Sequence, residues 1–352
     1  MRILGIMSGS SLDGIDLATV VFDEADPSDW RLENSKCYSF GSQLKNRLEL
    51  SLELQARGLA ELEADYTDFI AECILDFQKA FPEAFSYCSV HGHTLVHDVE
   101  NKFSWQMLNA GLLSSLTNKH IVTDFRNQDL GYGGLGTPMA ALIDRDLFSD
   151  FDYCINLGGI ANISYGEDEA YRAYDIAPCN QVHDHLAKMC SMEYDESGQL
   201  GRQGVLDERL LNELLLLAAA KKISPAIDNS WIREYWIPKL PSSTVSPQDL
   251  LRTHYEFIAR HISSLCSKAD SKVLLSGGGA KNQYLVELIQ SNLRPSVQLH
   301  LPDPGIIDFK ECILMSYMAY KRIKKELNFI KESTGAGQEV SAGAIYYCKS
   351  LD

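Results

Sequence analysis

Several features that mark common protein classes are missing from this 352-residue chain. Its 32 Lys and Arg residues are outnumbered by 48 Asp and Glu residues, which gives a net charge of −16, and the basic residues form no cluster. Nucleic-acid binding draws on concentrated cationic charge, so a nucleic-acid partner is not expected. The longest apolar run, Leu214 to Ala220, is far too short to span a bilayer, so no membrane segment is expected either.

Disulfide and secretion signals are also missing. The nine cysteines are odd in number and include no Cys-x-x-Cys pair, which favours free thiols in a reducing compartment. The apolar run at the N-terminus, Ile3 to Met7, is too short for a signal peptide. We therefore expect a cytoplasmic protein.

The length and composition indicate a folded protein of two domains. A chain of 352 residues exceeds the usual size of one core, and its apolar fraction of 45% is ordinary for a globular protein. No Gly/Ser-rich linker or low-complexity segment interrupts it. A glycine cluster at residues 131–136, followed by Thr137-Pro138, is the expected joint between the two halves.

The stretch Gly5 to Asp16, GIMSGSSLDGID, has the composition of a phosphate-binding turn. Glycine lets the backbone approach a phosphate closely, and the amide groups of a strand-end turn donate to anionic oxygens without a basic side chain. Asp13 and Asp16 offer the oxygen ligands that Mg²⁺ prefers. A plain β-hairpin is the alternative, since Asp13-Gly14 is a common hairpin dipeptide, and no Walker GxxxxGK follows.

Three glycine turns of this kind follow predicted strands, at Gly9–Gly14, Gly158–Asn162 and Gly277–Asn282. The first two each lie between a strand and a second strand, one in each half, which suggests a duplicated architecture. If they face each other across a cleft, they can hold phosphates from both sides while the third accepts the nucleoside. Such an arrangement resembles that of the actin-like sugar kinases, in which two related lobes clamp ATP.

Other segments are assigned to the scaffold. Apolar residues from Tyr66 to Phe81 recur at helical spacing and predict a core-facing helix. Ser246-Pro247-Gln248-Asp249 predicts a helix start, with Ser246 as the N-cap. Asp195 and Gly198 are interpreted as a structural tight turn.

Specific segments occur in the order seen in one family. They are GSSLDGID, HGHT at His91, VTDFRNQDLGYGGLGTP from Val122, INLGGIANIS from Ile155, YDIAPCN from Tyr174, SGGGAKN from Ser276 and STGAGQEVSAGAI near the end. On these segments the chain resembles the anhydro-N-acetylmuramic acid kinase family from Ile3 to about Ile345.

The resemblance implies a fold and an activity. The fold would be α/β, a two-lobed actin-like (ribonuclease H-like) sugar kinase with mixed sheets flanked by helices and the active site in the interlobe cleft. Residues 1–130, completed by about 331–352, would form the N-terminal lobe, and 131–330 the C-terminal lobe. The enzyme would use ATP and Mg²⁺ to open the 1,6-anhydro bridge of anhydro-N-acetylmuramic acid with water and phosphorylate O6, in peptidoglycan recycling. It would bind its amino sugar and ATP, and a homodimer is possible.

The resemblance also assigns residues. Matching the segment after Pro-x-Asn places the catalytic base on Asp184, although a solvated carboxylate between His183 and His185 is the alternative. Arg126 and Asp124 match the sugar-contacting Asp-Phe-Arg element, where an arginine suits the lactyl carboxylate; the competing account is an Arg126–Asp129 ion pair. The remaining assignments are as follows: substrate, His91, Thr94 and Glu311; nucleotide, Gly9, Ser10, Ser11, Asp13, Gly14, Asp16, Gly158, Gly159, Asn162, Gly277, Gly278, Gly279 and Asn282; metal, Asp13 and Asp16.

Several segments depart from the family pattern. The family's Asp-Thr-Gly-Pro-Gly-Asn is here Asp175-Ile176-Ala177-Pro178-Cys179-Asn180, and its His-Gly-Gln-Thr is His91-Gly92-His93-Thr94. Its Gly-Ala-Pro is Gly136-Thr137-Pro138, and its Lys-Ser-x-Gly-x-Glu is Asn229 to Glu234. The changes fall mostly on the sugar side. An actin-fold kinase for a different amino or anhydro sugar is therefore one alternative, and a non-catalytic nucleotide-binding protein is another.

Overall fold

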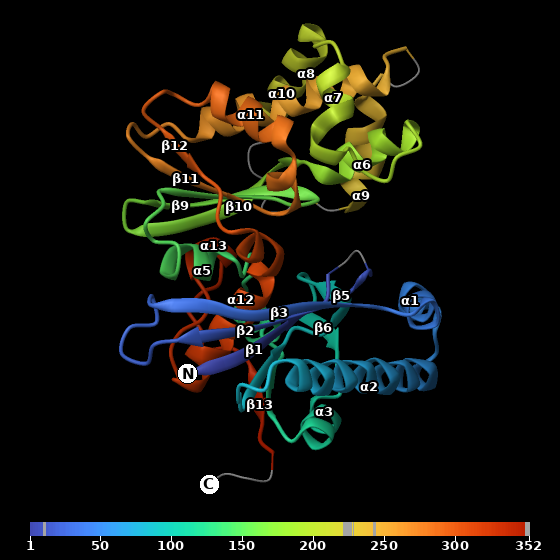
Figure 1. The fold of residues 1–352 in the computed structure, drawn as a ribbon, viewed down its shortest axis with the longest axis vertical. Helices are drawn as coiled ribbons and strands as arrows, with labels where there is room; N and C mark the ends of the chain where they lie inside the picture. Colours follow the sequence, from blue (N-terminus) through green and yellow to red (C-terminus); the bar gives the residue numbers. More distant parts are fainter. Residues whose placement is uncertain (10–11, 221–226, 228, 242–243, 349–352) are drawn as a thin grey trace. The chain divides into compact units, whose positions relative to one another are not determined.

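The computed structural model describes residues 1–9, 12–220, 227, 229–241 and 244–348. The chain forms two compact units: Met1–Leu147 together with the chain from Phe309 onward, and Phe148–Asp308 (Figure 1). The first unit therefore includes the C-terminal part of the chain as well as the N-terminal part. The divisions fall after Leu147 and before Phe309, rather than after residue 130 and before residue 331.

Long-range contacts explain why residues 131–147 stay with the first unit. The backbone N–H of Gly136 donates to the Asp129 carboxylate at 2.7 Å, and Thr334 Oγ1 donates to the same carboxylate at 2.8 Å. Further along, Tyr317 Oη donates to Asp146 at 3.0 Å. The glycine cluster is thus a turn within the first unit and not a joint between units.

The first unit is built on a six-stranded mixed sheet in the order β13-β7-β4-β1-β2-β3. Strands β1, β2 and β3 are antiparallel neighbours, β4 and β7 run parallel to β1, and β13 closes the edge antiparallel to β7. The bounds are β1 Arg2–Met7, β2 Gly14–Phe22, β3 Trp30–Ser39, β4 Tyr87–Val90, β7 His120–Thr123 and β13 Ala344–Tyr346; a separate hairpin pairs β5 His93–Asp98 with β6 Phe103–Met107.

Helices cover both faces of this sheet because β1 alternates its side chains. Leu4 and Ile6 belong to one core cluster with the apolar stripe of α2, which confirms the predicted core-facing helix. On the other face Gly5 lies against α12, where an added Cβ would come within 2.8 Å of the Cys312 carbonyl carbon. The helix bounds are α1 Ser42–Glu49, α2 Ala56–Ala80, α3 Ala110–Thr117, α4 Arg126–Gly131, α5 Ala141–Asp146, α12 Pro304–Ile323 and α13 Lys331–Thr334.

The second unit repeats the same plan with a five-stranded sheet in the order β10-β9-β8-β11-β12. Strands β8, β9 and β10 are antiparallel neighbours, and β11 and β12 continue the sheet parallel to β8. The bounds are β8 Tyr153–Leu157, β9 Ile160–Glu167, β10 Ala170–Pro178, β11 Lys272–Ser276 and β12 Gln298–His300. The helices are α6 Asn180–Met189, α7 Gln199–Gln203, α8 Glu208–Ala220, α9 Asn229–Trp231, α10 Pro247–Leu265 and α11 Gln283–Asn292.

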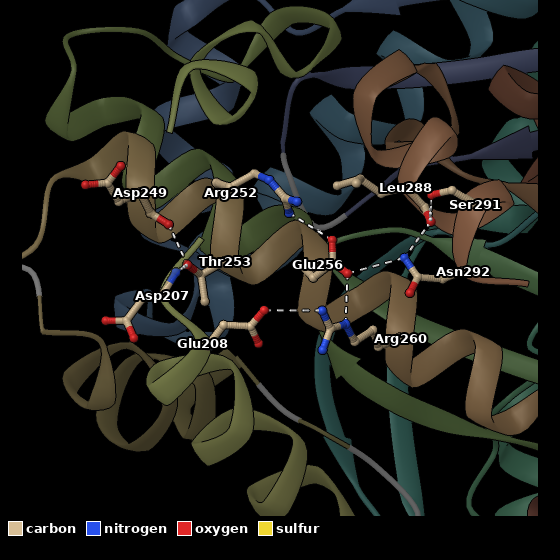
Figure 2. Close-up of polar contacts among 10 residues, drawn as sticks. All are labelled: Asp207, Glu208, Asp249, Arg252, Thr253, Glu256, Arg260, Leu288, Ser291 and Asn292. Carbon is tan, nitrogen blue, oxygen red and sulfur yellow. Dashed lines mark hydrogen bonds and ion pairs between the residues drawn. The ribbon is translucent and has the colours of Figure 1, made fainter. Parts of the chain in front are cut away.

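Helix α10 is the buried spine of this second unit. It begins as predicted, because the Ser246 hydroxyl accepts a hydrogen bond from Asp249 N at 3.1 Å. Figure 2 shows two arginines of α10 pointing toward the carboxylate of Glu256. Arg252 Nη1 donates to this buried carboxylate at 2.9 Å and Arg260 Nε at 2.8 Å. Asn292 of α11 reaches the same carboxylate at 3.4 Å, so the cluster ties the two helices together.

The two sheets share one topology. Starting from the third strand, each runs third, second, first and then two strands parallel to the first: β3-β2-β1-β4-β7 and β10-β9-β8-β11-β12. This repeated mixed sheet flanked by helices is the duplicated α/β arrangement expected of an actin-like fold. In the described part of the chain, no helix is long and apolar enough to cross a membrane.

Candidate functional site

The first glycine turn connects β1 to β2, and Met7 lies opposite Asp16 in their register. Leu12 adopts a positive φ of 55°, and its N–H faces the Gly9 carbonyl at 3.4 Å. Gly14 is required by the neighbouring strand, because an added Cβ would come within 2.8 Å of Ser39 Cα in β3. Two residues assigned to this turn, Ser10 and Ser11, lie outside the described residues.

The acidic residues near this turn differ in their surroundings. The Asp13 side chain is 79% exposed and lies 3.6 Å from Lys45 Nζ. Asp16 is half-buried in β2, and its carboxylate acts electrostatically on Glu311 of α12. Loss of solvation raises the pKa of Glu311, and the negative charge of Asp16 raises it further. The positive charges of Arg126 and Lys310 oppose that shift. Asp16 and Glu311 therefore lie close enough for their charges to interact.

These carboxylates suit a magnesium ion only in combination with a ligand. Among the described residues, no group of three or more His, Cys, Asp or Glu side chains is placed to hold a metal. Mg²⁺ is commonly bound by one or two carboxylates, with phosphate oxygens and waters completing its shell. Asp13 and Asp16, which lie beside a glycine turn, fit this mode of binding by two carboxylates together with a phosphate ligand.

Arg126 and His91 are brought together in the first unit. Arg126 opens α4, and its Nε and Nη2 lie 3.1 and 3.0 Å from His91 Nε2. His91 is buried and its Nδ1 lies 2.9 Å from its neighbour's carbonyl, that of Gly92. Burial and the Arg126 charge lower the pKa of His91 to about 3. A neutral imidazole with its proton on Nδ1 satisfies both contacts, since Nε2 then accepts from the guanidinium.

The Arg126–Asp129 ion pair is not found in the described part of the chain. Asp129 instead accepts hydrogen bonds from Gly136 N and Thr334 Oγ1. Arg126 forms no ion pair with any described carboxylate, although burial lowers its pKa to about 10 and the Glu311 charge opposes that effect. A half-buried guanidinium bonded to a neutral acceptor keeps its full charge available to an anionic ligand.

Two other residues assigned to the substrate, Asp124 and Thr94, follow β7 and lie in β5 respectively. Asp124 follows β7 with a positive φ of 58°, and its exposed side chain accepts a hydrogen bond from Asn127 at 2.6 Å. Thr94 lies in β5 and faces Gln106 of β6 at 3.4 Å. The β5–β6 hairpin was not expected from the sequence, and it contributes the strand beside His91.

The two glycine turns of the second unit pack against the start of α6. The carbonyls of Gly158 and Gly159 accept hydrogen bonds from Asn180 N at 3.1 Å and Cys179 N at 2.9 Å. Asn180 Nδ2 also donates to the Leu157 carbonyl at 2.9 Å. Asn162, the last residue assigned to this turn, lies in β9 opposite Asn156. These bonds fix the first turn of α6 against the end of β8.

The third turn packs closely against the end of β8. Gly277 has a φ of 82°, and an added Cβ there would come within 2.8 Å of the Leu157 carbonyl carbon. At Gly279 an added Cβ would lie 2.7 Å from Leu157 Cβ, whereas at Gly278 the nearest atom would be 3.6 Å away. Asn282 caps α11 by accepting from Leu285 N at 3.0 Å.

These segments surround one cavity of about 530 Å³ within the second unit. Four residues assigned from the sequence line it: Asp184, Gly278, Gly279 and Asn282. The other lining residues have no ligand predicted from the sequence; they are Asn180, His183, Tyr194, Asp195, Glu196, Ser197, Tyr255 and Lys281. Asp195 has the structural role expected of it, because its carboxylate accepts from Leu200 N, Gly201 N and Tyr255 Oη.

Asp184 is half-buried on α6 and faces this cavity. Burial raises the pKa of its carboxyl group, and Lys188 opposes that shift. Its neighbours differ: His183 is buried and His185 is exposed. A carboxylate with a raised pKa that lines a cavity is suited to take up a proton during a reaction.

Comparisons with known proteins agree on one family. A family model described as anhydro-N-acetylmuramic acid kinase matches residues 1–348. The enzyme of that name from Sulfurovum sp. is 31% identical, over 98% of this chain and 99% of the relative. The one from Vibrio vulnificus strain YJ016 is 28% identical, over 97% of each chain.

Solved structures align more loosely. The activator of the 2-hydroxyisocaproyl-CoA dehydratase from Clostridium difficile, with bound ADPNP, covers 92% of this chain and 97% of its own at 14% identity and a TM-score of 0.45. A hexokinase of the ROK type from Thermus thermophilus covers 91% and 99% at 11% identity and a TM-score of 0.43. Since the family model and the relatives span nearly the whole sequence, the chain belongs to the anhydro-N-acetylmuramic acid kinase family.

Proposed function

We propose that this protein is an ATP-dependent sugar kinase that opens the 1,6-anhydro ring of anhydro-N-acetylmuramic acid and phosphorylates O6. The products are N-acetylmuramic acid 6-phosphate and ADP. Family membership supports the reaction, and the observation that carries it is the position of Asp184. A carboxylate of raised pKa lines the same cavity as the Gly278–Gly279 backbone, so a base and a nucleotide-type turn share one space.

Asp184 acts as the general base in this proposal. It takes a proton from water as the water oxygen bonds to the anomeric carbon, while the bond from that carbon to O6 breaks. O6 then bonds to the γ-phosphorus of ATP, and ADP leaves. General-base assistance contributes about 10² to 10⁴ in rate. Burial strengthens Asp184 as a proton acceptor because it raises the pKa of the carboxyl group.

Arg126 binds the lactyl carboxylate of the sugar in this proposal. Its guanidinium is oriented by His91 and forms no ion pair with a described carboxylate. Charge-assisted hydrogen bonds from arginine to a carboxylate are among the stronger polar contacts in proteins. Asp124, Thr94 and Glu311 are proposed to contact the sugar from the same region of the first unit.

ATP is proposed to bind at the three glycine turns. The Gly277–Gly279 turn accepts the nucleoside, because two of its glycines permit backbone packing that no side chain would allow. The Gly9–Gly14 and Gly158–Asn162 turns bind phosphates, and Asp13 and Asp16 hold Mg²⁺. The ion would neutralise charge on the transferring phosphoryl group. All nine cysteines carry free thiols, which suits a reducing compartment such as the cytoplasm.

ADP release measured with a panel of sugars tests the proposal. The panel contains anhydro-N-acetylmuramic acid, anhydro-N-acetylglucosamine, N-acetylmuramic acid and N-acetylglucosamine. We expect turnover with the first sugar and a 6-phosphate product by mass spectrometry. Turnover with another sugar alone would favour a kinase of different specificity. ADP binding without turnover on any sugar would favour a non-catalytic nucleotide-binding protein.

A further inference from the structure

Three buried side chains form a hydrogen-bonded chain behind the cavity of the second unit. Trp236 Nε1 lies 3.2 Å from His254 Nε2, and His254 Nδ1 lies 3.0 Å from His183 Nε2. The three residues come from the segment before α10, from α10 itself and from α6. They are at most 4% exposed. His183 is the member of the chain that lines the cavity.

The direction of this chain follows from its first donor. An indole N–H can only donate, so His254 Nε2 accepts and carries no proton. His254 therefore keeps its proton on Nδ1 and donates it to His183 Nε2. His183 Nε2 is then the acceptor, which leaves the His183 proton on Nδ1. Burial lowers the pKa of His254 to about 3 and that of His183 well below its ordinary value, so both rings are neutral.

His183 thus presents one unused donor. Its Nδ1 has no hydrogen-bond partner among the described residues, whereas its Nε2 is bonded to His254. Because His183 lines the cavity, this donor can be satisfied by a ligand that enters it. The rings of Tyr255 and His183 pack in a T-shaped arrangement with centroids 4.6 Å apart, so the imidazole contacts an aromatic ring as well as its hydrogen-bonded partner.

The charges around the cavity indicate which kind of ligand can bind beside His183 Nδ1. Asp184, Asp195 and Glu196 line it, and Lys281, the one cation among its described lining residues, is paired with Asp308. Such a wall disfavours phosphate and carboxylate groups. An uncharged, flat group with acceptor atoms fits better, and Tyr194 offers it an exposed aromatic ring.

We propose that His183 is a nucleoside-binding residue, whose Nδ1–H donates a hydrogen bond to an acceptor atom of the adenosine part of the nucleotide. The inference rests on the proposed function for the identity of the nucleotide. Trp236 and His254 are positioning residues, because they fix the tautomer that makes Nδ1 a donor.

Isothermal titration of the full-length protein with ADP, and separately with anhydro-N-acetylmuramic acid, tests this role. His183→Phe keeps an aromatic ring and removes the donor. We expect ADP binding to weaken about three- to tenfold, the effect of one lost hydrogen bond, while sugar affinity is unchanged. Unchanged ADP affinity would overturn the assignment, and so would equal weakening for both ligands.

His185→Phe is the matched control, because it makes the same change two residues along α6 on an exposed side chain. It should leave both affinities at the wild-type level. The proposed function can fail separately. If wild-type protein binds ADP but turns over no sugar, and His183→Phe still weakens ADP binding, the nucleoside assignment stands and the kinase assignment falls.

A second measurement needs no variant. In wild-type protein labelled with ¹⁵N-histidine, NMR should report His183 as a neutral ring protonated on Nδ1, with that proton resonance moving when ADP is added. An Nε2-protonated or charged ring would contradict the hydrogen-bond chain. A His183 resonance that moves with the sugar and not with ADP would contradict the choice of ligand.

Discussion

Arg126 directs two of its N–H groups, from Nε and Nη2, at a single atom of His91, the unprotonated Nε2. The arrangement orients the guanidinium without neutralising it, because the acceptor is an uncharged ring whose pKa is lowered to about 3. Replacing the acceptor by a carboxylate would quench the charge that an acidic ligand needs. The pair is therefore suited to bind an anionic group of a ligand.

Arg126→Met should raise KM for anhydro-N-acetylmuramic acid by about 10- to 100-fold, since charge-assisted hydrogen bonds contribute about 1.5–3 kcal/mol each. The KM for ATP should stay near the wild-type value. Steady-state kinetics with each substrate varied in turn measures both. Arg202→Met, which removes an exposed arginine paired with Glu287, is the control. Equal loss for ATP and sugar would assign Arg126 to the scaffold.

Asp184→Asn should lower kcat by about 10²- to 10⁴-fold and leave ADP affinity nearly unchanged, because the amide cannot accept the proton. The wild-type enzyme should lose kcat/KM as Asp184 is protonated. The midpoint of that acid limb should lie above 3.8, the ordinary value, because burial raises the pKa of this group. Turnover that survives in Asp184→Asn would show that another group is the base.

Asp184→Asn should also stabilise the folded protein at neutral pH. Burial raises the pKa of Asp184 in the folded state, so the ionised carboxylate destabilises the folded protein. This destabilisation disappears as the pH falls towards the pKa of the group in the unfolded chain. The gain in Tm over wild type should therefore be largest near pH 7 and shrink in acid. Differential scanning calorimetry at several pH values measures it. Glu193→Gln, an exposed site, should show no such gain.

Neighbouring glycines of the third turn should respond differently to alanine. Gly277→Ala forces a side chain into a left-handed conformation and towards the Leu157 backbone, so it should cost about 1–3 kcal/mol of folding free energy. Gly278→Ala meets nothing closer than 3.6 Å and should unfold like wild type. Because Gly278 lines the cavity, its added methyl should still weaken ADP binding. Urea unfolding and ADP titration separate the two effects.

Glu256→Gln should cost about 1–3 kcal/mol at neutral pH, because it leaves Arg252 and Arg260 without their shared anion. Burial alone would raise the pKa of Glu256, yet Arg260 and Arg252 hold it below 4.5. Its stabilising contribution is therefore present above pH 4.5 and lost as the pH falls through the lower folded value. Thermal unfolding across pH should show the difference from wild type fading in acid, while Glu287→Gln on the surface shows little at any pH.

Local chemistry made much of the fold predictable. The Ser246 cap, the apolar stripe of α2 and the strands before the glycine turns all follow from residues close in sequence. The unit boundaries did not follow, because they depend on distant partners such as Asp129 and Thr334, and no local signal connects those two residues.

The candidate site was predictable to a similar degree. Gly278, Gly279, Asn282 and Asp184 were identified from turn chemistry and family motifs, and they line one cavity. In the sequence, His183 is distinguished only as a neighbour of Asp184. Its role depends on His254 and Trp236, which lie far along the chain and approach it only after α6 and α10 pack. An isolated histidine in the sequence gives no sign of such a partner.

The discontinuity of the first unit has a consequence for synthesis on the ribosome. Its sheet takes an edge strand, β13, and one covering helix, α12, from the far end of the chain, whereas the second unit is a single uninterrupted segment, Phe148–Asp308. Domains generally fold as units while the chain emerges. The second unit can therefore reach its native state first, whereas the sheet of the first unit is complete only after β13 has been synthesised.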